Sequence, residues 1–170
     1  MPRCSQCGAE HDLLEPAFRR PEAYVQLGRA AREAHSKADD DLCRITLPRQ
    51  SPRYFVRGVL TVDVRGVPEG VGWGLWAEVP KAAFLRVVEL WSAHDQATEA
   101  PFRASLANVI PAYPDTLGLA LELQLTGPTS RPELRFSREV EHPFARECEA
   151  GVDPHRVSEW SAMMGAPALQ

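Results

Sequence analysis

The fold is decided by residues 54–79, which have the sequence YFVRGVLTVDVRGVPEGVGWGLWAEV. In the first half, Leu60, Val62 and Val64 alternate with polar residues, and this period of two is typical of a half-buried strand. A glycine- and proline-rich turn follows, and residues 73–79 again place apolar side chains on one face. The stretch therefore predicts a β-hairpin.

The segments around this hairpin predict further strands and helices. Leucine occupies every second position of Leu117–Leu125, which indicates a strand, and Gly127–Ser130 then turns the chain back. Elsewhere we expect helices at residues 21–37 and 81–95, a strand at 133–140, a short strand or turn at 104–110, a turn or helix at 142–149, and a helix capped by Asp153 with Pro154 at its first position. This order predicts a single α+β domain over residues 1–170, with an antiparallel β-sheet covered by helices and a loose tail at 165–170.

The composition is that of an ordinary globular protein. The chain has 170 residues, of which 44% are hydrophobic and 25% are charged, enough to bury roughly 70% of the surface of the unfolded chain. The net charge of -4 argues against broad nucleic-acid binding, which depends on Lys and Arg neutralising phosphates. A cluster of arginines lies in the sequence near four aspartates, so we expect a mixed, solvated surface there: Arg44, Arg49, Arg53, Arg57 and Arg65 with Asp39, Asp40, Asp41 and Asp63.

The sequence offers no membrane-spanning segment. The most apolar stretch, around Leu117–Leu125, is interrupted by polar residues or glycine at every second position. The N-terminus enters a cysteine motif directly, without the apolar stretch of a secretory signal. We therefore expect a cytoplasmic protein that does not contact a membrane.

The clearest chemical motif is Cys4-Ser5-Gln6-Cys7-Gly8. Two thiolates separated by two residues can bind one tetrahedral ion from a tight turn, and a glycine after them can take the positive φ that points backbone amides at the sulfurs. We interpret residues 1–12 as a knuckle for zinc. A closed zinc site needs four ligands, and the remaining ones are expected among His11, His35, Cys43, His142 and Cys148.

Three roles for these cysteines remain open. A structural zinc would tie the N-terminus to the loop at Cys43 or to the segment at His142. A catalytic zinc would need an open coordination position for water and a carboxylate near it, such as Asp41 or Glu141. A reduced, metal-free dithiol is the third alternative, whereas a structural disulfide is not expected in a cytosolic chain.

Several motifs in the same order resemble a bacterial family known as domain of unknown function 2199. They are Cys4-x-x-Cys7-Gly8-x-x-His11, Asp41-Leu42-Cys43, Phe55-x-Arg57-Gly58-x-Leu60, Trp73-Gly74-x-Trp76, Tyr113-Pro114-x-Thr116, Arg131-Pro132, and His142-Pro143-Phe144-Ala145 followed by Gly151. The resemblance extends from Cys4 to about Val157. It implies one domain and one site assembled from Cys4, Cys7, Cys43 and either His11 or His142, but it implies no activity.

The sequence favours a binding protein over an enzyme. The phosphate-binding glycine loop, the Gly-x-Ser-x-Gly elbow and the His-Glu-x-x-His pair are all absent from it. The leading hypothesis is a zinc-stabilised module that binds an unidentified protein partner as a regulator, for example an immunity-type partner of a toxin. A small zinc-dependent hydrolase and a metal-free dithiol protein are the alternatives.

Overall fold

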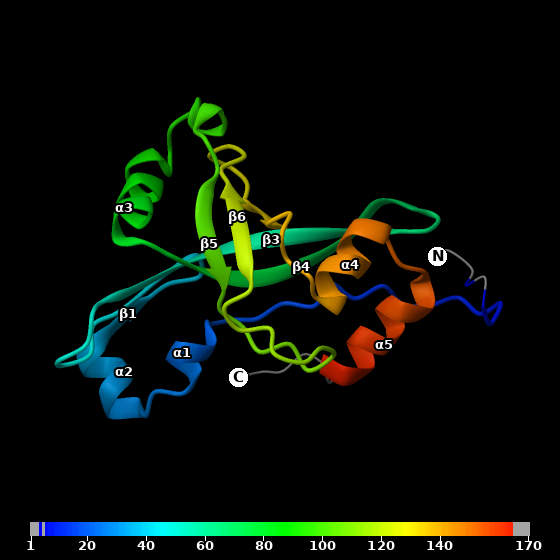
Figure 1. The fold of residues 1–170 in the computed structure, drawn as a ribbon, viewed down its shortest axis with the longest axis horizontal. Helices are drawn as coiled ribbons and strands as arrows, with labels where there is room; N and C mark the ends of the chain where they lie inside the picture. The colour runs from blue at the N-terminus through cyan, green and yellow to red at the C-terminus, as the bar shows by residue number, and fades with distance from the viewer. Residues whose placement is uncertain (1–3, 5, 165–170) are drawn as a thin grey trace.

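A computed structural model describes Cys4 and residues 6–164, so the predicted tail at 165–170 lies outside the described part of the chain. The described residues form five α-helices and seven strands, which Figure 1 shows arranged as an α+β domain. In chain order they are α1 Glu22–Val25, α2 Arg29–His35, β1 Ser36–Ala38, β2 Leu42–Ile45, β3 Arg53–Val64, β4 Val67–Val79, α3 Lys81–Leu90, β5 Phe102–Leu106, β6 Ala120–Gln124, β7 Glu133–Phe136, α4 Pro143–Ala150 and α5 Pro154–Met164, with a 3-10 turn at Gln96–Thr98.

The predicted hairpin is confirmed and is longer than expected. β3 and β4 pair antiparallel from Tyr54 opposite Val79 to Val64 opposite Val67. Gly66, in the connecting turn, has a φ of 78°, a conformation in which a side chain would be strained. The alternation of apolar and polar residues in the sequence therefore corresponds to the two alternating faces of the folded strand.

The seven strands form one sheet that closes on itself. Neighbouring strands pair antiparallel in the order β1 to β7, and β7 returns to β3 in a parallel contact at Val59 and Glu133. The amide of Val59 donates to the carbonyl oxygen of Pro132 at 2.9 Å. A Cβ at Gly58 would lie 2.7 Å from Leu134 Cγ, so only glycine lets the two strands approach this closely. The result is a five-stranded ring, β3 to β7.

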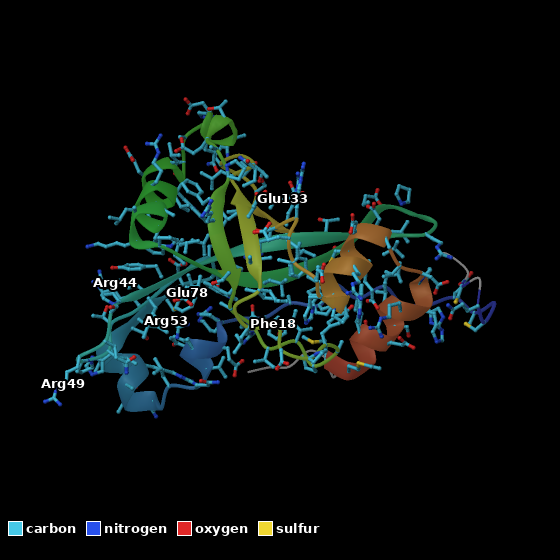
Figure 2. The ribbon with its side chains drawn as sticks, in the orientation of Figure 1. Phe18, Arg44, Arg49, Arg53, Glu78 and Glu133 are labelled. Atoms are coloured by element: carbon cyan, nitrogen blue, oxygen red, sulfur yellow. The ribbon has the colours of Figure 1, made fainter. Side chains whose placement is uncertain are left out.

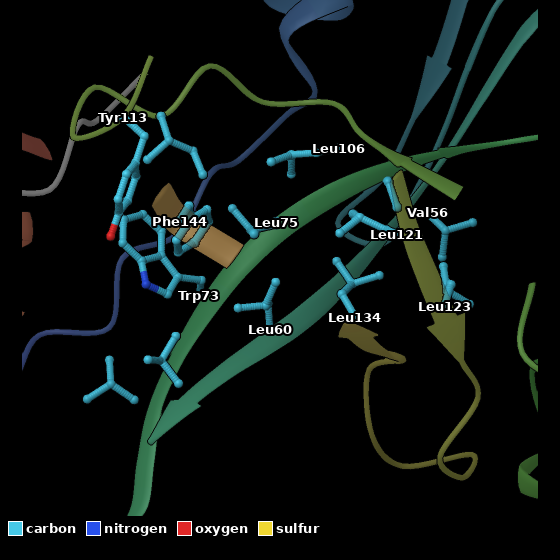
Figure 3. Close-up of a cluster of buried hydrophobic side chains, with 14 of the residues drawn as sticks. Val56, Leu60, Trp73, Leu75, Leu106, Tyr113, Leu121, Leu123, Leu134 and Phe144 are labelled. Carbon is cyan, nitrogen blue, oxygen red and sulfur yellow. The ribbon is translucent and has the colours of Figure 1, made fainter. Parts of the chain in front are cut away.

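Apolar side chains fill the interior of this ring (Figure 3). Trp73 on β4 is completely buried and packs edge-on against Phe144 of α4 and Trp160 of α5, with ring centroids 5.2 and 5.1 Å apart. Leu121, Leu123 and Leu125 of the predicted alternation are buried there as well, whereas Leu119 is half-buried and Leu117 is 49% exposed, because β6 begins only at Ala120. Burial of this apolar surface is the main source of the stability of the ring.

The predicted helix at residues 21–37 is wrong in its extent. The chain forms two short helices, α1 and α2, and then enters strand β1 at Ser36. Gly28, between the helices, has an extended conformation with φ −65° and ψ 159°, and glycine has a low helix propensity. The other helices are confirmed near their predicted positions, although α3 ends at Leu90 rather than at Asp95.

A segment that we call the N-terminal strap, residues 15–18, lies along β4. Phe18 N donates to Gly74 O and Gly74 N donates to Pro16 O, both at 2.9 Å. A Cβ at Gly74 would lie 2.9 Å from the Cβ of Ala17, so glycine permits the close approach. The strap leads back to the knuckle, and in Figure 1 the described N-terminal residues lie at the same end of the molecule as α5.

Candidate metal centre

The knuckle is built by a tight turn of the backbone. The amide of Gly8 donates to the carbonyl oxygen of Cys4 at 2.8 Å, and Gly8 has the positive φ, 71°, that the sequence predicted. The amide of Gln6 donates to the Cys4 sulfur at 3.4 Å. Such donors stabilise a thiolate, because they place positive partial charge next to the sulfur.

The structure brings four potential metal ligands together. They are Cys4, Cys7, His11 and His155, and their ligand atoms all lie within 4.8 Å of one another. Within this group, Cys7 Sγ and His11 Nε2 lie 3.2 Å apart. Ligand atoms around a tetrahedral zinc ion lie about 3.3–3.8 Å from each other, so the group needs only a small contraction to bind an ion.

The N-terminus of α5 positions His155. Asp153 Oδ1 accepts a hydrogen bond from the amide of His155 at 2.8 Å, and Pro154 occupies the first helical position, as predicted. The same carboxylate oxygen lies 3.8 Å from the sulfur of Cys4. Asp153 therefore connects the knuckle and the helix that supplies the fourth side chain.

The two ring nitrogens of His155 have different surroundings. Nδ1 is buried and has no hydrogen-bond partner among the described residues. Nε2 lies 3.8 Å from a carboxylate oxygen of Glu159, one turn further along α5. A buried polar atom without a hydrogen-bond partner destabilises the folded state. An ion bound at Nδ1 would supply the partner that this atom lacks.

Cys43 and His142 lie elsewhere, in two different environments. Cys43 is buried in a second apolar cluster with Phe55 and Trp76, where burial raises the pKa of its thiol to about 12. His142 caps α4, since its Nδ1 accepts from the amide of Phe144 at 3.2 Å and its Nε2 pairs with the carbonyl oxygen of Pro114 at 2.7 Å. Both nitrogens of His142 are thus engaged by the backbone.

The structure therefore unites three of the predicted ligands, Cys4, Cys7 and His11, and adds a fourth that is absent from the set predicted from sequence. His155 follows the predicted cap Asp153 by two residues, which was the available signal. Cys148 lies on α4, half-buried, and burial raises the pKa of its thiol to about 12. Asp41, a carboxylate considered for a catalytic zinc, pairs with Arg131 at 2.6 Å.

The donor set determines which ions the group suits. Two thiolates with two imidazoles form the tetrahedral shell typical of structural zinc sites, whereas calcium and magnesium prefer oxygen ligands. The group is compatible with a metal ion of this class.

No helix within Cys4 and residues 6–164 is long and apolar enough to cross a membrane.

Comparison with known proteins identifies the family but no activity. The chain belongs to the family described as uncharacterized protein conserved in bacteria (DUF2199), whose profile matches residues 3–152. The matched range contains Cys4, Cys7 and His11 and ends three residues before His155. No curated protein and no solved structure matches the chain.

Proposed function

We propose that this member of the DUF2199 family binds one zinc ion through Cys4, Cys7, His11 and His155, and that the ion has a structural role. The observation that supports this most directly is the buried Nδ1 of His155, which has no hydrogen-bond partner among the described residues and belongs to a group of four ligands. Nδ1 would be the atom that coordinates the ion. The four side chains would complete a tetrahedral shell and leave no position for a substrate.

Groups around the four ligands support the same assignment. The carboxylate of Glu159 faces Nε2 of His155. A carboxylate commonly occupies this place beside a metal-bound imidazole and orients its ring. The amide of Gln6 donates to the sulfur of Cys4, and Asp153 fixes the start of α5. These outer contacts would hold the ligands in place before an ion arrives.

The ion would tie two distant parts of the chain together. The segment that leads into α5 is anchored to the sheet, since Arg65 N donates to Val152 O at 3.0 Å and Val152 forms a bridge with Val64. Zinc would attach the knuckle to this helix and so keep the strap on β4. We infer that the domain held in this way acts by binding another protein, as a regulatory module does, with the metal remaining away from the bound partner.

Metal content per chain tests the proposal. We expect about one zinc per chain, by elemental analysis of untagged protein, and its loss in Cys4→Ser, Cys7→Ser and His155→Ala. Cys43→Ser and His142→Ala are the matched controls and should retain zinc, because their side chains lie outside the group.

Two outcomes would contradict the assignment. Loss of zinc from Cys43→Ser with the fold intact would mean that the ligand set differs from the one in the structure. Protein that is folded and free of metal under reducing conditions would favour the dithiol role for Cys4 and Cys7.

A further inference from the structure

A groove lies at the opposite end of the β3–β4 hairpin from the metal ligands. It consists of two adjoining hollows of about 450 and 300 Å³, whose linings share Arg53, Glu78 and Ser105. Figure 2 shows Arg53 and Glu78 at this end of the hairpin, away from α5. Both hollows are open to solvent, so together they form an elongated depression rather than an enclosed pocket.

The groove exists because β4 and β5 separate. Their pairing is limited to Ala77 opposite Leu106 and Glu78 opposite Ser105. Pro80 then leads the chain into α3 and cannot donate a backbone hydrogen bond to β5. The larger hollow lies between the diverging strands.

The larger hollow carries positive charge on an acidic protein. Lys81 and Arg103 are exposed on its walls, and neither has an ion-pair partner within the described part of the chain. Arg53 is neutralised by Glu78, with a nitrogen–oxygen distance of 2.6 Å. Glu122, opposite Arg103 on β6, also lies opposite Arg135 on β7, so its charge is shared between two arginines.

The smaller hollow has an apolar wall. Leu117, which is 49% exposed, lines it together with Ala23 and Ala107, and the polar residues Glu22 and Gln26 of the α1 region line the same hollow. An exposed leucine beside a hollow is a suitable contact for an apolar side chain of a ligand.

We propose that this groove binds an extended, acidic segment of a partner protein, with carboxylates at Lys81 and Arg103 and an apolar side chain at Leu117. The open, elongated shape suits a peptide better than a compact small molecule, and the unpaired cations complement acidic side chains. The inference rests on the proposed protein-binding role of the domain and does not depend on the zinc ion.

Fluorescence anisotropy with two labelled octapeptides tests the groove. One probe alternates glutamate with leucine, and the other alternates lysine with leucine. We expect the zinc-loaded protein to bind the glutamate probe, and Lys81→Glu/Arg103→Glu to bind it at least about fivefold more weakly, because the double variant replaces two attractive charge contacts with two repulsive ones. Arg138→Glu/Arg146→Glu makes the same charge change elsewhere and should bind like the wild type.

In NMR spectra of the wild type, addition of the glutamate probe should change the backbone amide chemical shifts of Lys81, Ser105 and Leu117. The inference would be overturned by equal binding of both probes, by an equal loss in the two double variants, by no binding of the glutamate probe at low salt, or by tighter binding of an oligothymidylate in the same groove. Zinc content is measured on the same samples. Binding of the glutamate probe by purified protein that contains no zinc would support the groove assignment and contradict only the metal proposal.

Discussion

The five-stranded ring and the group of potential metal ligands are held together in different ways. Inside the ring, aliphatic side chains such as Leu60 and Leu75 are at most 2% exposed and are held by packing. In the ligand group only Cys4 is buried, and a nitrogen of His155 has no protein partner among the described residues. The ring is therefore held by burial of apolar surface, whereas the N-terminal group is compatible with a metal ion that would hold its side chains together.

The largest effect is expected where the ring closes. Gly58→Val would place a branched side chain within 2.8 Å of the Pro132 carbonyl oxygen, which belongs to the backbone and cannot easily move. We expect the free energy of unfolding to fall by about 3 kcal/mol or more, measured by urea denaturation. Gly28→Ala, where an added Cβ meets nothing within 4 Å, is the control and should lower stability by about 1 kcal/mol or less, because alanine is a poorer N-cap of α2 than glycine. A small effect of Gly58→Val would mean that β3 and β7 are not tightly closed.

Removal of zinc is expected to have the next largest effect. At free zinc a hundredfold above its dissociation constant, one bound ion adds about 2.7 kcal/mol to the free energy of unfolding. A chelator should remove this contribution from the wild type and have no effect on Cys7→Ser, with Cys148→Ser behaving like the wild type. If urea curves with and without zinc coincide for the wild type, the N-terminal region does not depend on a metal.

A smaller effect is expected where the helices meet the ring. The hydroxyl of Tyr113 donates to Glu147 and accepts from Trp160 Nε1 at 2.8 Å, and burial together with Glu147 raises the pKa of Tyr113. Tyr113→Phe should destabilise the protein by about 1–2 kcal/mol, because it leaves a buried indole N–H without an acceptor. Tyr24→Phe changes a half-buried side chain of α1 and should leave the free energy of unfolding nearly unchanged in the same denaturation assay. Equal effects would show that the Tyr113 network contributes little.

The weakest expected effect concerns the reactivity of the thiols. In folded, metal-free protein at pH 8, iodoacetamide should modify the exposed Cys7 quickly and Cys43 and Cys148 only after unfolding, as read by mass spectrometry. Burial raises the pKa of both protected thiols from 9.0 to about 12, so the folded state keeps protons that the unfolded state releases. Their contribution to stability is complete below pH 9 and is lost as the pH rises toward 12. Rapid labelling of Cys43 in folded protein would contradict its burial.

Local patterns in the sequence predicted much of the ring. Alternation over Leu117–Leu125 identified β6, and the hairpin followed from a pattern of the same kind. Closure of the ring could not be predicted, because it depends on Gly58 meeting Pro132 and Leu134 from a distant part of the chain. The fate of Gly28 was also ambiguous, since a glycine within a helical pattern can be tolerated or can end the helix.

The candidate site divides along the same line. Cys4, Cys7 and His11 are close in sequence and were recognised by their spacing. His155 reaches them only through the packing of α5, which no spacing rule contains. Cys43 and His142 lie outside this group, one as a buried thiol and the other as a helix-capping imidazole. Residue type alone does not distinguish such side chains from metal ligands.

The position of His155 also sets an order of events during synthesis. The knuckle leaves the ribosome first, and about 140 further residues must follow before the fourth side chain emerges. Until then the nascent chain presents two thiols and one imidazole without the helix that completes the set. A chain that ends before α5 can never assemble the group, so the presence of all four side chains in one place is a signature of a fully translated domain.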